Sequence, residues 1–125
     1  MADEDPSFEI PAYPRRVFSR TGVEHDGKTA FTLTPDADCD PFSAVDRIGT
    51  DERYVFGDWF DLPMPVYLVY DREVSTVFRV VIYAGSVELR VLPSTDPQGL
   101  AAFYRALRTE SGCEWSVECE TTIDR

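Results

Sequence analysis

The chain has 125 residues, and its 23 acidic and 12 basic residues leave a net charge of −11 at pH 7. This length predicts one domain that buries roughly two thirds of the surface its unfolded chain would expose. No apolar run approaches the ~20 residues that a membrane-spanning helix requires. Since the acidic start, residues 1–5, leads into no apolar segment, we expect no secretory signal, no membrane partner and a cytoplasmic location.

The basic residues are one lysine, Lys28, and eleven arginines. An acidic excess with so little lysine resembles in composition the cytosolic proteins of halophiles, and we expect a halophilic source; an ordinary acidic mesophilic protein is the alternative. In ~1 M salt the Debye length falls to ~3 Å, so the self-repulsion of such a chain largely vanishes. The same charge argues against nucleic acid as a partner, because phosphate binding requires a basic stripe.

The N-terminal part is predicted to form an arm and a hairpin. Residues 1–14 contain three prolines and are expected to be a frayed or extended arm. The dipeptide Asp26-Gly27 is a strong signal for a type I′ turn, which would pair a strand at 17–24 with a strand at 28–34.

Two helices are expected. Asp40-Pro41 and Gly49 bracket a short helix whose apolar face would carry Phe42, Val45 and Ile48. This pattern is weak and predicts one or two turns.

The second helix has clearer signals. Thr95 as N-cap and Gln98 three residues later match a capping box, and Gly112 suits the position after the helix, which would run to about residue 111. An apolar stripe at helical spacing predicts the side that packs on a sheet: Leu100, Phe103, Tyr104 and Leu107.

The central stretch, residues 66–92, reads as three consecutive strands. A Gly85-Ser86 turn would join the last two, and an Ala84-Gly85 turn would shift the pairing by two residues and leave every side chain on its face. The predicted core face carries Phe78, Val80, Ile82, Val87, Leu89 and Val91, and the opposite face carries Arg79, Val81, Tyr83, Glu88 and Arg90.

The first of these three strands, residues 66–70, is apolar on both sides, so a second cover is needed. The N-terminal hairpin, an irregular loop or a second copy of the chain are the candidates. Further strands are expected at 53–60 and 113–120. The order predicts a single α+β domain over residues 15–125, with a mostly antiparallel sheet of six to seven strands, one main C-terminal helix on one face and one short helix.

Catalytic chemistry is poorly supported. Cys113 and Cys119 share a strand face roughly 20 Å apart and are expected to be core residues, and Cys39 lies among carboxylates that raise its thiol pKa. His25 has no partner in its vicinity. Asp36, Asp38 and Asp40 begin like a calcium loop, but Pro41 and Arg47 stand where such a loop needs Gly and Glu. We therefore predict no catalytic residue, metal or cofactor, and the interpretation leans away from an enzyme.

Two features remain as candidate binding sites. Arg79 and Arg90 lie on adjacent predicted strands and would repel each other unless a carboxylate or a bound anion separates them; Glu88 or Glu73 is the simpler explanation. The segment 57–65 is rich in large apolar groups, Trp59, Phe60 and Met64 among them, and either plugs the core or forms a contact surface.

The first hypothesis for function is a non-catalytic association module that forms a homodimer through a face or an edge of its sheet. The second is a small-molecule or anion-binding domain that uses Arg79, Arg90 and the Trp59 loop. The first follows from residues 66–70, because the main predicted helix covers only one side of the sheet.

Overall fold

The computed structural model describes the backbone of residues 6–11, 13, 15–19, 22–26, 28–60 and 65–122, with side chains for all of these except residues 15–19, 22–26, 28, 58–60 and 122. In chain order the elements are β1 (Arg15–Ser19), β2 (Gly22–Asp26), β3 (Lys28–Pro35), α1 (Pro41–Ile48), β4 (Tyr54–Phe60), β5 (Val66–Asp71), β6 (Thr76–Ile82), β7 (Val87–Val91), α2 (Pro97–Ser111) and β8 (Trp115–Thr122).

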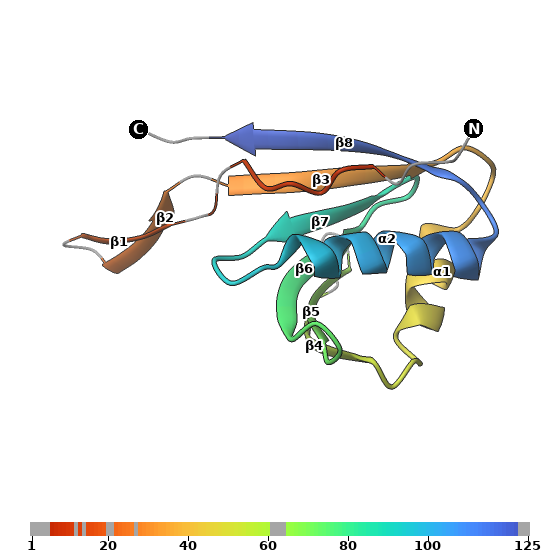
Figure 1. Ribbon diagram of the computed structural model, residues 1–125, viewed down its shortest axis with the longest axis horizontal. Helices are drawn as coiled ribbons and strands as arrows, with labels where there is room; N and C mark the ends of the chain where they lie inside the picture. Colours follow the sequence, from red (N-terminus) through yellow and green to blue (C-terminus); the bar gives the residue numbers. More distant parts are fainter. Residues whose placement is uncertain are drawn as a thin grey trace.

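Six of the strands form one antiparallel sheet in the order β4-β5-β6-β7-β3-β8, and β1 pairs with β2 in a separate two-stranded sheet. The predicted α+β class, with an antiparallel sheet, a main C-terminal helix and one short helix, is confirmed. Figure 1 shows α2 lying across the sheet, with α1 beside the C-terminal end of α2.

One hydrophobic core lies between the main sheet and the two helices. The six residues that were predicted for the core face of β6 and β7 are all buried in it, as is the predicted stripe of α2. The ring of Phe103 meets those of Tyr54 and Phe78 edge-on, at centroid distances of 5.7 and 5.4 Å. Burial of this apolar area is what holds both helices on the same side of the sheet.

The N-terminal arm packs on this side as well. Phe8 is buried, and its ring lies 5.1 Å from that of Phe31 and 5.7 Å from that of Tyr104, measured between centroids. Tyr13 donates a hydrogen bond from its hydroxyl to the carbonyl of Thr95 at 3.0 Å. The described part of the arm therefore adds to the cover over β3 and α2.

The hairpin between β6 and β7 uses the second of the two predicted turns. The N–H of Tyr83 donates to the carbonyl of Ser86 at 2.9 Å, which leaves Ala84 and Gly85 at the turn. Because the shift between the two registers is two residues, equal to the strand repeat, each side chain keeps its predicted face.

The predicted hairpin over Asp26-Gly27 is wrong. Strand β2 pairs with β1, while β3 pairs with β7 and β8. Phe31 and Leu33 on β3 are 1% and 0% exposed, so placing β3 inside the main sheet buries two large side chains. That burial outweighs the local preference of an Asp-Gly turn. Residue 27 itself lies outside the described residues.

The apolar face of α1 differs from the predicted one at one position. Val45 and Ile48 are buried as expected, but Phe42 is 41% exposed and Ala44 is buried in its place. The small Ala44 allows α1 to lie close to the core, and Phe42 points outward at the first turn of the helix.

The N-cap of α2 is Asp96, not Thr95. The Asp96 carboxylate accepts a hydrogen bond from the N–H of Gln98 at 2.9 Å. Thr95 is engaged elsewhere, since its buried hydroxyl accepts from the N–H of Leu92 and donates to the carbonyl of Val77. Tertiary hydrogen bonds have therefore displaced the cap by one residue. At the other end Gly112 occupies the predicted position after the helix, in the left-handed conformation with φ of 71°.

Candidate functional site: the far face of the sheet

The candidate site is the side of the main sheet that points away from both helices, called the far face below. Strand register places its side chains in rows. One row holds Val55, Tyr70 and Val77, side by side on β4, β5 and β6. The next row holds, in order across the sheet, Gly57, Leu68, Arg79, Arg90, Ala30 and Glu120. The far face thus changes from apolar over β4 and β5 to charged over β7 and β8.

The apolar part of the far face, Val55, Leu68, Tyr70 and Val77, is called the β4–β6 patch. Val55 is 41% exposed and Tyr70 is 40% exposed, while Leu68 and Val77 are half-buried. The alternate side chains of β5 point into the core, where Val69 is fully buried. Strand β5 is therefore apolar on both sides, as the sequence predicts, and its two sides are unequally covered.

The cover of the far face is uneven along the strands. Val81, on the same face of β6, is fully buried, whereas Val55 and Tyr70 at the other end are not. Figure 1 shows the β1–β2 hairpin beyond the end of β3 and well away from β5, so this hairpin does not cover the β4–β6 patch. The second candidate cover was an irregular loop, to which no residues were assigned; residues 61–64, which precede β5, lie outside the described residues.

Arg79 and Arg90 face each other directly across β6 and β7. Arg90 donates from Nε to the carboxylate of Glu88 at 2.9 Å, and Glu88 also accepts from the hydroxyl of Tyr83 at 3.1 Å. Burial works to lower the pKa of Arg90, but the hydrogen bond and charge of Glu88 outweigh it and raise the pKa. Within the described part of the chain, Arg79 has no ion-pair partner.

Of the two carboxylates considered for this arginine pair, Glu88 lies beside Arg90 and Glu73 lies elsewhere. Glu73 is 3.4 Å from the guanidinium of Arg53, at the turn between β5 and β6. Of the two arginines, Arg90 is thus neutralised by an acidic side chain of the same protein. The positive charge of Arg79 lies next to Leu68, at the border between the β4–β6 patch and the charged strands.

The side chains of the remaining predicted binding residues lie outside the part of the chain that the structure describes. Trp59 and Phe60 belong to the last part of β4, where the pairing with β5 is irregular between Gly57 and Phe60, and their side chains are outside the described residues. Met64 is outside them altogether. The role of the Trp59 loop as a plug or contact surface stays a prediction.

The cysteines are placed differently from the expectation. Cys119 is exposed, so its prediction as a core residue is wrong, whereas Cys113 is half-buried and packs against the edge of the core. Cys113 precedes β8, where the buried side chain is that of Trp115. Its sulfur lies 2.7 Å from that of Cys39, a contact that the sequence analysis missed because the two are 74 positions apart.

The thiol of Cys39 is a weaker acid here than an ordinary cysteine thiol. Partial burial, the hydrogen bond and charge of Cys113, and the carboxylates of Asp36 and Asp38 together raise its pKa to about 11. The expected direction is confirmed, although burial and Cys113 contribute more than the carboxylates do.

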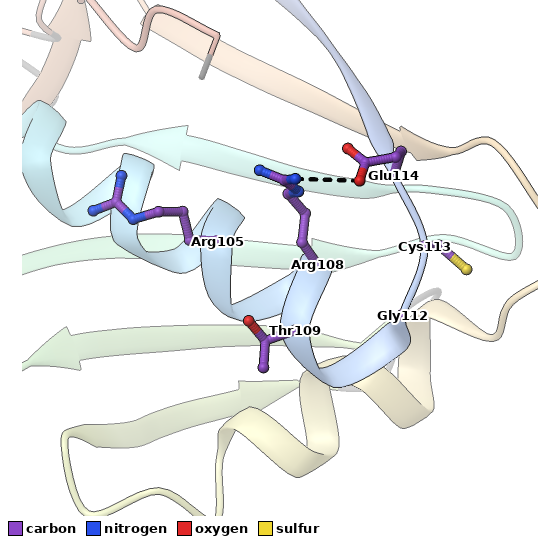
Figure 2. Close-up of a pocket in the computed structure, with 6 residues that line it drawn as sticks. All are labelled: Arg105, Arg108, Thr109, Gly112, Cys113 and Glu114. Atoms are coloured by element: carbon purple, nitrogen blue, oxygen red, sulfur yellow. Dashed lines mark hydrogen bonds and ion pairs between the residues drawn. The ribbon is translucent and has the colours of Figure 1, made fainter. Parts of the chain in front are cut away.

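Several other polar groups lie at the helix ends. Among the described residues, no cluster of three or more histidine, cysteine, aspartate or glutamate side chains could hold a metal ion. Asp40 serves as the N-cap of α1, accepting from the N–H of Phe42 at 3.1 Å. A shallow cleft at the C-terminal end of α2 (Figure 2) is lined by Arg105, Arg108, Thr109, Gly112, Cys113 and Glu114. Arg108 and Glu114 form an ion pair across it at 3.2 Å.

Comparisons with known proteins add no relative: no protein-family model, curated protein or solved structure matches this chain. Among the described residues, neither helix has the length and hydropathy needed to cross a membrane.

Proposed function

We propose that this protein is a non-catalytic association module that forms a homodimer through the far face of its sheet. The observation that carries the proposal is the β4–β6 patch, in which three neighbouring strands present Val55, Tyr70 and Val77 in one row. Tyrosine at the centre of a contact surface supplies large apolar area with little conformational entropy. Two copies related by a two-fold axis would bury this row against itself.

Charge favours this part of the sheet over the opposite edge. Strand β8 forms that edge, and its far-face side chains include the exposed Glu118 and Glu120. Edge-to-edge pairing of two β8 strands would bring these carboxylates together, which charged edge residues generally prevent. The β4–β6 patch carries no such acid among its four residues.

The composition leads us to propose further that the dimer works in a cytoplasm rich in salt. Two copies with a net charge of −11 each repel one another in dilute buffer. At ~1 M salt the Debye length of ~3 Å screens this repulsion, while burial of apolar area is retained. Dimerisation should therefore strengthen as KCl is added.

The test compares a charge placed in the patch with the same charge placed elsewhere. Tyr70→Glu should weaken dimerisation at least tenfold in sedimentation equilibrium in concentrated KCl, because a carboxylate would be buried without a partner. Phe42→Glu on α1 is the matched control, since Phe42 is 41% exposed on the helix side. Equal dissociation constants for the two variants would contradict the proposed surface.

A second candidate function, binding of a small anion or an anionic small molecule, is favoured by the direct pairing of Arg79 with Arg90. Glu88 neutralises Arg90, so the ligand would contact Arg79 first, with the Trp59 loop, including Phe60 and Met64, as its predicted apolar wall. Anion-dependent thermal shifts that disappear in an Arg79→Ala, Arg90→Ala variant would support this function. Shifts unchanged by the double substitution would exclude the pair as the binding site.

A further inference from the structure

Cys39 lies just before the start of α1, and Cys113 lies just after the end of α2. Cys39 comes directly before Asp40, the N-cap of α1, and Cys113 comes directly after Gly112, the C-cap of α2. The two sulfur atoms are 2.7 Å apart, and Cys39 donates its S–H to Cys113. A disulfide bond of about 2.05 Å would require the sulfurs to approach by only ~0.7 Å.

The backbone around this pair is held by contacts that do not involve the sulfurs. The N–H of Asp36 donates to the carbonyl of Glu114 at 2.8 Å, joining the end of β3 to the start of β8. Arg47 of α1 donates to the carbonyl of Glu110 in α2, also at 2.8 Å. The closeness of the thiols therefore follows from contacts that pack the start of α1 against the end of α2 without using the sulfurs.

Both thiols are accessible to a small reagent, because each cysteine is only half-buried. Cys113 also lines the shallow cleft of Figure 2, where its side chain points away from Arg105 and Arg108. Cys119 is exposed on β8, with its sulfur 3.9 Å from the hydroxyl of Thr121. It offers a control thiol in the same chain.

We propose that Cys39 and Cys113 are a redox modification site, at which a reversible disulfide ties the start of α1 to the end of α2. The oxidant is a small-molecule disulfide. The Cys113 thiolate attacks one sulfur of the oxidant and displaces a thiolate. Cys39 then loses its proton and attacks the Cys113 sulfur of the mixed disulfide, displacing the second thiolate. Two protein thiols are oxidised to one disulfide, and one small disulfide is reduced to two thiols.

The order of the two attacks follows from the environments. The raised pKa of Cys39 leaves little thiolate near neutral pH, so Cys39 is suited to the second, intramolecular step, where its neighbour is already in place. The bond would close a ring over 74 positions of the chain and restrict the unfolded state. It would also fix the helix layer at the end where α1 meets α2.

The test treats the reduced full-length protein with oxidised glutathione and maps the products. We expect a Cys39–Cys113 link in peptide mapping, a drop from three reactive thiols to one, and a rise in melting temperature on the order of 10 °C that dithiothreitol reverses. Cys39→Ser and Cys113→Ser should each stop at a mixed disulfide with glutathione and lose the rise. Cys119→Ser should form the same link and show the same rise, with its reactive thiols falling from two to none.

Peptide mapping of the unaltered chain tests for the Cys39–Cys113 disulfide even if a cysteine variant folds poorly. A link that involves Cys119, a link between two copies, or glutathione remaining on Cys113 of the unaltered chain would overturn the proposal. A Cys39–Cys113 link that leaves the melting temperature unchanged would overturn the claim that it fixes the helix layer.

Discussion

Asp71 at the end of β5 is a fully buried carboxylate, and its setting explains why the fold tolerates it. Arg53 donates to its two oxygens from Nε and Nη2 at 2.9 and 3.0 Å. The N–H groups of Glu73 and Val74, in the turn to β6, donate to the same carboxylate at 2.9 and 3.3 Å. Ser75 closes this turn with a positive φ of 58°. The buried charge of Asp71 is thus satisfied by these four hydrogen bonds, and two of them also shape the β5–β6 turn.

Asp71→Asn should lower the free energy of unfolding by about 3 kcal/mol, because the buried amide nitrogen would face the Arg53 guanidinium and the paired charge-assisted hydrogen bonds from Arg53 would be lost. Glu73→Gln is the control: Glu73 is 67% exposed and 3.4 Å from Arg53, so its loss should cost at most about 0.5 kcal/mol. Urea unfolding measures both. Equal effects would mean that the buried carboxylate contributes little.

A pH dependence follows for the reactivity of the Cys39 thiol in the reduced protein. The groups that face this thiol are Cys113, Asp36 and Asp38, and with burial they raise its pKa to about 11. Below that pH the thiolate fraction grows about tenfold per pH unit. Alkylation of Cys39 by iodoacetamide in the reduced protein, followed by peptide mapping, should therefore accelerate about tenfold per pH unit between pH 7 and pH 10. A rate that levels off near pH 9 would show an unperturbed thiol.

At the scale of single residues, the sequence predicts what depends on periodicity and misses what depends on distant neighbours. The faces of Phe78 and Val80 and the left-handed Gly112 follow from local rules. The contact between Cys39 and Cys113 and the hydrogen bonds of Thr95 depend on packing between segments far apart in the chain. The exposed Phe42 belongs with these, because nothing local distinguishes it from Val45.

Among the elements, α2 approaches strand β6 closely at Gly99, near the N-terminus of the helix. A Cβ added there would collide with the Cγ2 atom of Thr76 on β6. Thr76 is itself buried and accepts a hydrogen bond from the N–H of Asp96 at 2.7 Å, so it cannot move aside freely. The glycine is needed for close approach of helix and strand.

Gly99→Ala should therefore lower the free energy of unfolding by about 1–3 kcal/mol, despite the gain of about 1 kcal/mol that alanine brings to a helix interior. Gly85→Ala is the control, because nothing lies within 4 Å of its added Cβ and its φ is not positive. Thermal unfolding of the two variants measures the difference. A stabilised Gly99→Ala variant would contradict the close packing of α2 on β6.

The elements were easier to predict than their partners. The approximate helix limits and the strands at 53–60, 66–70 and 77–92 follow from the spacing of apolar residues and from the Pro, Gly and capping residues at the ends. The place of β3 between β7 and β8 depends instead on long-range pairing. The Asp26-Gly27 signal pointed to the wrong partner for β3 because a turn preference of local origin competes with burial of Phe31 and Leu33. For the candidate site, the sequence indicates that β5 is apolar on two sides but cannot tell which end stays exposed.

For the molecule as a whole, the net charge determines how its stability depends on salt concentration. A net charge of −11 disfavours the compact state in dilute buffer, and salt screens it as the Debye length falls from ~10 Å at 0.1 M to ~3 Å at 1 M. The melting temperature should rise with KCl, with most of the rise below ~1 M. A neutral osmolyte of equal osmolarity is the control. A melting temperature independent of KCl would remove the basis for a high-salt setting.

Both helices and the described part of the N-terminal arm cover one side of the sheet, and the β4–β6 patch on the other side remains partly open. The central claim is that a second copy covers it. The most direct measurement is the molar mass of the unaltered protein by light scattering in concentrated KCl over a range of protein concentrations. We predict twice the mass of one chain, with dissociation on dilution or on removal of salt. A single-chain mass at every concentration would contradict the claim.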